Sequence, residues 1–195
     1  PKSAKAKRLY FQANGKLSFD APTESAGVDE YISDPNRPVP FIGYTALGVP
    51  QPYMVGDQRF ASKRPDVLVY QTDVLESDVG VSGPVTGKLF VSTTGTDSDF
   101  IVKLIDVYPD QDTYHPETAG MQTGIGFEIF RGRYVKDFAK PQALKPGKAE
   151  NYKFGLPNVD HVFLKGHKIM VQVQSTLFPL YDRNPQTFVP NMFYA

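Results

Sequence analysis

The sequence contains no cysteine and no tryptophan. Without cysteine the chain has no disulfide, no thiol nucleophile and no cysteine-ligated zinc, and its redox compartment stays open. No apolar run approaches the roughly 20 residues of a membrane span, and the first residues lack the apolar core of a signal peptide. The 21 basic residues balance the 21 acidic ones, so no excess of charge predicts binding to nucleic acid or to a membrane surface.

The residues that are present predict a folded domain. Of the 195 residues, 41% are hydrophobic and 13% aromatic, which is too rich in core material for a disordered chain. This length fits one domain, residues 1–195, and all-β sandwiches often reach it undivided. The 17 prolines and 16 glycines indicate many turns.

Apolar and polar residues alternate with period two along much of the chain. Asn14-Gly15 separates two short alternating runs and is typical of a tight hairpin, because both residues tolerate positive φ. From Asp66 onward strand-like runs follow one another, with turn signals such as Ser82-Gly83-Pro84 between them. The pattern predicts an all-β fold, a jelly-roll β-sandwich. The expected strands are 66–72, 85–93, 100–107, 124–134, 150–156, 161–164 and 168–175.

Residues 20–65 interrupt this pattern. The segment is rich in proline and has little strand character. It is too long for a plain connector, because most connections in compact domains are far shorter. We therefore expect this excursion to have a role of its own within the single domain.

A search for catalytic and metal-binding patterns finds none. The string "GVSGP" around Ser82 has neither the spacing nor the following helix of a nucleophile elbow, so Ser82 is interpreted as a turn residue. The histidines are His115, His161 and His167, and none has a second histidine at metal-binding spacing. The expectation is no catalytic residue, no metal and no cofactor in this chain.

Several charged residues invite structural hypotheses. Asp97 and Asp99 in "TGTDSDF" are weak evidence for calcium and are better interpreted as caps on backbone amides. Asp106 lies in an apolar strand and needs a partner, which Arg131 or Arg133 of "FRGRY" could supply. Exposed aromatic platforms for sugars usually use tryptophan, which is absent, so a sugar site is left without a motif.

Long stretches of the chain resemble one known family. "FIVKLIDVYPD" lies within Arg64 to Asp110, a stretch similar to the C-terminal domain shared by X-Pro dipeptidyl-peptidases, cocaine esterase and α-amino acid ester hydrolases. "LKGHKIMVQVQSTLFPLYDRNPQTFVPNMF", Leu164 to Phe193, resembles the branch of ester hydrolases and glutaryl-7-aminocephalosporanic acid acylases. The similarity extends over essentially the whole chain.

This resemblance implies a galactose-binding-like jelly roll that packs on an α/β-hydrolase domain, its partner within one parent chain. The Ser-His-Asp triad of the family lies in that catalytic domain, and no triad residue maps onto this sequence. The expected function is therefore non-catalytic, with packing on the catalytic domain and shaping of its acyl pocket. The resemblance also implies a parent serine hydrolase or acylase that is periplasmic or secreted, and a homo-oligomer of that parent is compatible with it.

Two segments are expected to contact the catalytic domain. In "FPLYDRNPQT", Asp182, Arg183 and Asn184 are predicted to hold the loop at or beneath the domain contact. In the excursion, "PFIGYTALGVPQPYM" is expected to place Tyr44, Leu47 and Tyr53 at the wall of the acyl pocket. We assign Asp99, Asp106, Arg131 and Arg133 to the interface or to structural pairing.

Three alternatives stay open. The loop at residues 182–184 would brace only the sandwich if it packs on itself, as compact loops often do. The chain would be a carbohydrate-binding jelly roll if it targets the enzyme to a glycan. It would be an autonomous enzyme if it holds an unrecognised site. Family members usually continue beyond the equivalent of "NMFYA" to a final strand, so we expect an unpaired sheet edge if that strand is missing.

Overall fold

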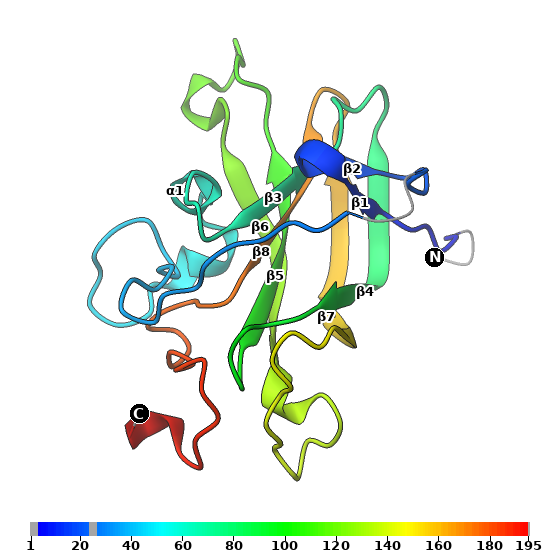
Figure 1. Cartoon of the computed structure of the whole chain (residues 1–195). Helices are drawn as coiled ribbons and strands as arrows, with labels where there is room; N and C mark the ends of the chain where they lie inside the picture. The colour runs from blue at the N-terminus through cyan, green and yellow to red at the C-terminus, as the bar shows by residue number, and fades with distance from the viewer. Residues whose placement is uncertain (1–3, 24–26, 195) are drawn as a thin grey trace.

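The computed structural model describes residues 4–23 and 27–194, in which eight strands form two facing sheets (Figure 1). The large sheet has the order β1-β2-β3-β8-β5-β6, and the small sheet pairs β4 with β7. The predicted all-β sandwich is thus confirmed. The strands are β1 Tyr10–Gln12, β2 Lys16–Ser18, β3 Leu68–Gln71, β4 Val79–Val91, β5 Asp99–Val107, β6 Gln122–Arg131, β7 Glu150–Phe163 and β8 Lys168–Gln174.

Strand β5 lies inside the large sheet, and all nine of its residues are buried. Apolar side chains of β5 point to both faces, because both faces are covered, although the strand also contains Asp99, Lys103 and Asp106. Phe100, Val102 and Leu104 point toward the small sheet. They pack in the core that contains Leu156 and Phe163 of β7. Ile101, on the opposite face, packs against Phe41 of the excursion. The molecule therefore has a third layer outside the large sheet.

The small sheet is one long antiparallel ribbon, and it corrects two sequence predictions. Ser82 does not lie in a turn between strands: it lies within β4, where the pairing register shifts between Gly83 and Val85. Gly83 has φ of 113°, which lets the strand continue through this irregularity. The expected strands 150–156 and 161–164 are a single strand, β7, because both pair with the uninterrupted β4.

The hairpin predicted at Asn14-Gly15 is confirmed. Strands β1 and β2 pair antiparallel, and the two turn residues have φ of 60° and 67°. A side chain at Gly15 would meet the carbonyl oxygen of Val69 at 2.7 Å, so the turn packs closely on β3. The sheet is not wholly antiparallel, since β2 meets β3 in parallel at Lys16 and Gln71.

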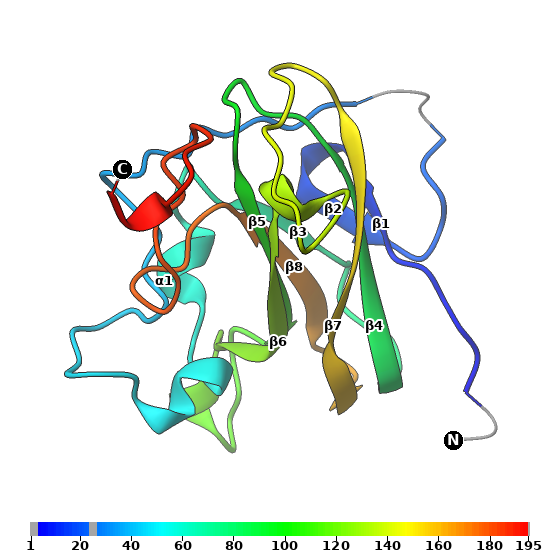
Figure 2. The same cartoon turned by 90° about the horizontal axis from the view of Figure 1, so that it is seen from below.

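The excursion covers the face of the large sheet opposite β4 and β7, as Figure 2 shows for residues 40–62. It contains a 3₁₀ helix at Gln51–Val55 and the one-turn helix α1 at Arg59–Ser62. The 3₁₀ helix presses on β6: a Cβ at Gly124 would lie 2.3 Å from the carbonyl oxygen of Met54. Among the described residues, no helix is long and apolar enough to cross a membrane.

Candidate docking surface

The loop after β8 is fastened to the excursion by backbone hydrogen bonds. The amide of Phe178 donates to the carbonyl of Val39, and the amide of Phe41 donates to the carbonyl of Phe178, each at 2.9 Å. The Thr176 hydroxyl accepts the amide of Val39 at 2.7 Å. Leu177 is buried beside Phe41. The opening of the loop and residues 39–41 therefore form one unit on the outer face of the sheet.

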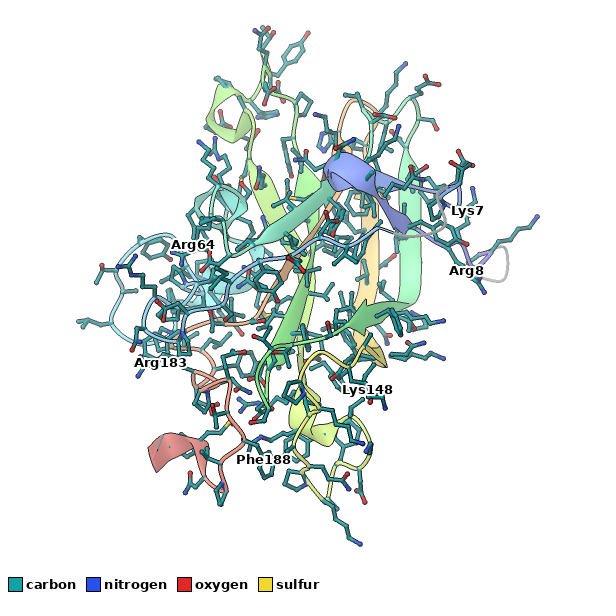
Figure 3. All side chains as sticks on the ribbon, viewed as in Figure 1. Lys7, Arg8, Arg64, Lys148, Arg183 and Phe188 are labelled. Atoms are coloured by element: carbon teal, nitrogen blue, oxygen red, sulfur yellow. The ribbon has the colours of Figure 1, made fainter. Side chains whose placement is uncertain are left out.

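Asp182 ties the middle of this loop to the end of β6. Both of its oxygens accept hydrogen bonds from the guanidinium of Arg131, the two-pronged geometry that suits arginine and carboxylate. The hydrogen bond from Arg131 holds the pKa of Asp182 below its usual range. Arg183, labelled in Figure 3, donates to the carbonyl of Pro35 in the excursion at 3.0 Å. Its guanidinium also lies over the ring of Phe178.

Asn184 anchors the same loop in the interior. Its side chain is fully buried and donates to Asp99 at 3.0 Å, while its amide oxygen accepts the backbone amide of Gln186 at 2.8 Å. This second bond stabilises Gln186 in a left-handed conformation, with φ of 62°. The loop therefore has a defined shape that depends on side chains from β5 and β6.

Asp99 is the least compensated charge in this region. It is 1% exposed, and its nearest cation is the Arg131 side chain, with Nε 3.9 Å from the carboxylate. Burial raises the pKa of Asp99 to about 7, and Arg131 opposes that shift only in part because it is also bound to Asp182. Below that pH the carboxyl is neutral, and above it a buried negative charge is present.

Arg133 forms a separate buried pair that the sequence analysis missed. Its Nε and Nη2 donate to Asp97 at 2.8 and 2.6 Å, and both residues are almost fully buried. Asp97 also accepts the amide of Ser98, the capping role expected for it. The guanidinium lies 5.0 Å from the ring centre of Phe188, which joins the end of the loop to this pair (Figure 3). The sequence did contain a signal for this pair. The acidic string "TDSD" begins one predicted strand and the basic string "FRGR" ends the next, so antiparallel pairing of the two strands brings the opposite charges together.

The expected pairing of Asp106 with an arginine is corrected by the structure. Asp106 accepts instead from His167 Nδ1 at 2.8 Å and from His161 Nε2 at 2.9 Å. The reason is position: Asp106 is near the end of β5, beside the start of β8 and His167, whereas Arg131 and Arg133 lie beside the start of β5. His161 and His167, which are six residues apart in the sequence, thus share one buried carboxylate.

The excursion presents an apolar surface next to the loop. Tyr44, Leu47, Val49, Met54 and Val55 are all exposed, and the Leu47 side chain is fully so. We call these five residues the apolar ridge. Monomeric proteins rarely expose apolar residues in such concentration without a partner.

The apolar ridge has a firm base. Tyr53 is half-buried, with its ring 5.7 Å from that of Phe41 and 6.0 Å from that of Phe127. Of the three residues expected at the acyl pocket, Tyr44 and Leu47 are exposed, whereas Tyr53 packs against Phe41 and Phe127. The ridge and the fastened loop lie on the same side of the molecule (Figures 1 and 2).

These two features form a candidate contact surface. No serine hydroxyl in the described part of the chain hydrogen-bonds to a histidine, so a nucleophile–base pair is not assembled there. Across residues 4–23 and 27–194 no three histidine, aspartate or glutamate side chains are grouped to hold a metal ion.

Comparison with known proteins identifies the family of this domain. Residues 1–191 match the family model described as the X-Pro dipeptidyl-peptidase C-terminal non-catalytic domain. This chain belongs to that family. It is 41% identical over 165 residues to cocaine esterase from Rhodococcus sp. (strain MB1 Bresler), an alignment that covers 85% of this chain and 27% of the esterase.

Two solved structures share both fold and sequence with this member of the family. An aminopeptidase from a marine sediment Thaumarchaeota archaeon superposes with a TM-score of 0.95 and 47% identity, over 100% of this chain and 33% of that one. An α-amino acid ester hydrolase gives a TM-score of 0.91 and 46% identity, over 99% and 32%. The chain thus spans about a third of the length of these relatives.

Proposed function

We propose that this chain packs on the catalytic domain of a serine α/β-hydrolase and helps to shape its acyl pocket. The observation that carries the proposal is the apolar ridge, an exposed apolar surface on a rigid base in a non-catalytic family domain. Tyr44 and Leu47 supply the side chains for the pocket wall. Tyr53 anchors the same segment to the domain through its contacts with Phe41 and Phe127.

The neighbouring loop gives the contact its shape. Asp182 and Asn184 connect it to β6 and β5, and its opening is bonded to residues 39–41. A contact surface that is already ordered loses little conformational entropy on binding, which favours a stable domain interface. We place the loop beneath the interface and the apolar ridge in it.

The substrates of the whole enzyme are proposed from its relatives. Two of them are named an aminopeptidase and an α-amino acid ester hydrolase. Esters or amides of α-amino acids are therefore the proposed class, with the chemistry supplied by the catalytic domain. Cephalosporin acylase activity and a galactose-binding-like site stay predictions, and no contact described above favours a carbohydrate ligand.

Replacing Leu47 with aspartate tests the docking role. The fully exposed side chain can lose no internal packing, so Leu47→Asp should leave the unfolding free energy unchanged within about 0.5 kcal/mol. In the whole enzyme it should weaken the hold of the domain and lower kcat/KM for an α-amino acid ester by at least about tenfold, because burying an unpaired charge costs several kcal/mol.

Phe90→Asp is the matched control. Phe90 is also an exposed apolar residue, but it lies on β4, at the opposite side of the sandwich from the apolar ridge (Figure 2). Its replacement should leave kcat/KM as in the parent enzyme. Equal activity of the two variants, or a loss seen only with Phe90→Asp, would contradict the proposed surface.

A further inference from the structure

A cavity of about 460 Å³ opens at the end of the sandwich from which residues 108–121 extend, at the top of Figure 1. None of the five residues of the apolar ridge lines it. All three histidines of the chain line it, although they are separated by up to 52 residues in sequence (115 to 167). The other lining residues are Asp106, Tyr108, Asp112, Thr118, Val162 and Leu164.

The hydrogen bonds of this cavity leave mainly acceptors for a ligand. An ionised carboxylate can only accept, so Asp106 takes the N–H of His161 Nε2 and of His167 Nδ1. In the neutral rings the other nitrogens, Nδ1 of His161 and Nε2 of His167, are then acceptors. Neither of these two nitrogens has a hydrogen-bond partner among the described residues, and neither is a fully buried atom. Both are therefore accessible to a ligand.

Asp112 adds a negative charge at the mouth of the cavity. Its Oδ1 accepts the backbone amides of Tyr114 and His115 at 2.8 and 2.9 Å. These hydrogen bonds, above all the one from the amide of His115, hold the pKa of Asp112 below its usual range and keep its carboxylate ionised. Its Oδ2 makes no hydrogen bond to the described residues. Glu117 does not line the cavity, but it pairs at 3.4 Å with His115, which does.

No lysine or arginine is among the residues that line the described cavity. The acceptors and carboxylates therefore repel an anionic ligand and attract a cationic one. A metal ion is disfavoured, because the described histidines and acidic residues are not grouped to coordinate one. The volume lies in the range of small-molecule sites, about 300–1,000 Å³.

The walls suit an organic molecule that carries its charge at one end. Val162 and Leu164 give apolar contact, and the ring of Tyr108 lies 4.6 Å from that of His167, so aromatic surface lies near the acceptors. Aromatic rings attract ammonium groups through their electron-rich faces. We propose that this cavity binds a small organic ammonium ion, with Asp112 and the free nitrogens of His161 and His167 as its acceptors.

The test uses benzylamine, with benzyl alcohol and benzoate as probes of the same ring but with no charge or a negative charge. Because the protein has only three histidines, the imidazole signals in an NMR spectrum report directly on the cavity. Benzylamine should shift the signals of His161 and His167 saturably, and the other two probes should not. No saturable shift with benzylamine, or equal binding of the alcohol, would overturn the proposal.

The variant Asp112→Asn removes the charge but keeps an oxygen to cap the same two amides. It should weaken benzylamine binding by about tenfold or more, the usual loss for a hydrogen bond to a charged group. Asp137→Asn is the matched control, because Asp137 likewise caps a backbone amide, that of Ala139, but does not line the cavity. Unchanged binding in Asp112→Asn, or an equal loss in both variants, would overturn the assignment.

Discussion

At the scale of single residues, the carboxyl of Asp99 has an unusual environment. It is buried at the start of β5, where one arginine must serve both Asp99 and Asp182. Asn184 supplies a neutral hydrogen bond but no charge. An acid whose pKa is raised in the folded state opposes folding once it ionises, so Asp99 reduces stability as the pH rises.

Asp99→Asn should remove this pH dependence. The folded pKa of about 7 lies above the usual value of 3.8, so the cost of the charge begins near pH 4 and is complete near pH 7. Relative to the parent, the variant should gain stability across that window, on the order of 2 kcal/mol. Urea unfolding of both proteins at pH 4 and pH 8 measures this, and a difference that does not change with pH would contradict it.

At the scale of elements, the buried pair of Asp97 and Arg133 connects three segments. Asp97 lies just before β5, Arg133 lies just after β6, and Phe188 comes from the loop after β8. Pairing of β5 with β6 brings the two charges together, since Asp99 lies opposite Arg131. The pair fixes how the end of the loop meets the sheet.

Arg133→Met should destabilise the protein by about 3 kcal/mol, because it leaves the carboxylate of Asp97 buried and unpaired. Adding Asp97→Asn should restore part of this loss, since asparagine is neutral and can still cap Ser98. Arg183→Met, at an exposed arginine, is the control and should change stability by less than about 1 kcal/mol. Denaturant unfolding of the four proteins measures this, and a double variant no more stable than Arg133→Met would contradict it.

At the scale of the whole molecule, a sandwich with a covering excursion presents exposed apolar residues at its side and a cavity at its end. The two lie on different elements, the apolar ridge on residues 44–55 and the cavity on β5, β7, residues 108–121 and residues 164–167. The extent of the single domain, residues 1–195, stays a prediction, as do the oligomer and compartment of the parent. The proposed division of labour leaves the chemistry to the catalytic domain.

The 195-residue protein should therefore not react with a fluorophosphonate, and should not hydrolyse a chromogenic amino-acid ester. In the described residues both nitrogens that contact Asp106 belong to histidines without a serine partner, so no activated nucleophile is available. Intact mass after treatment measures labelling, and a family esterase with its catalytic domain serves as the positive control. Stoichiometric labelling with turnover would contradict the non-catalytic role and direct attention to Ser82 and Ser98.

The sequence by itself determined the fold class, the hairpin at Asn14-Gly15 and the family, because period-two alternation, turn chemistry and long similar strings are local properties of the chain. It also indicated that residues 20–65 and 182–184 were more than connectors. Local patterns could not show that β4 passes through Ser82 without turning, since its long pairing with β7 overrides the turn signal.

Only the tertiary structure decided which charges meet. Asp106 has histidine partners, and Arg133 pairs with Asp97, because strand pairing and register bring residues together that are 36 to 61 positions apart. Exposure was likewise decided in three dimensions, since Tyr53 is packed and Leu47 is open within one short segment. A sequence records which side chains are present, whereas burial and partnership depend on how distant segments cover one another.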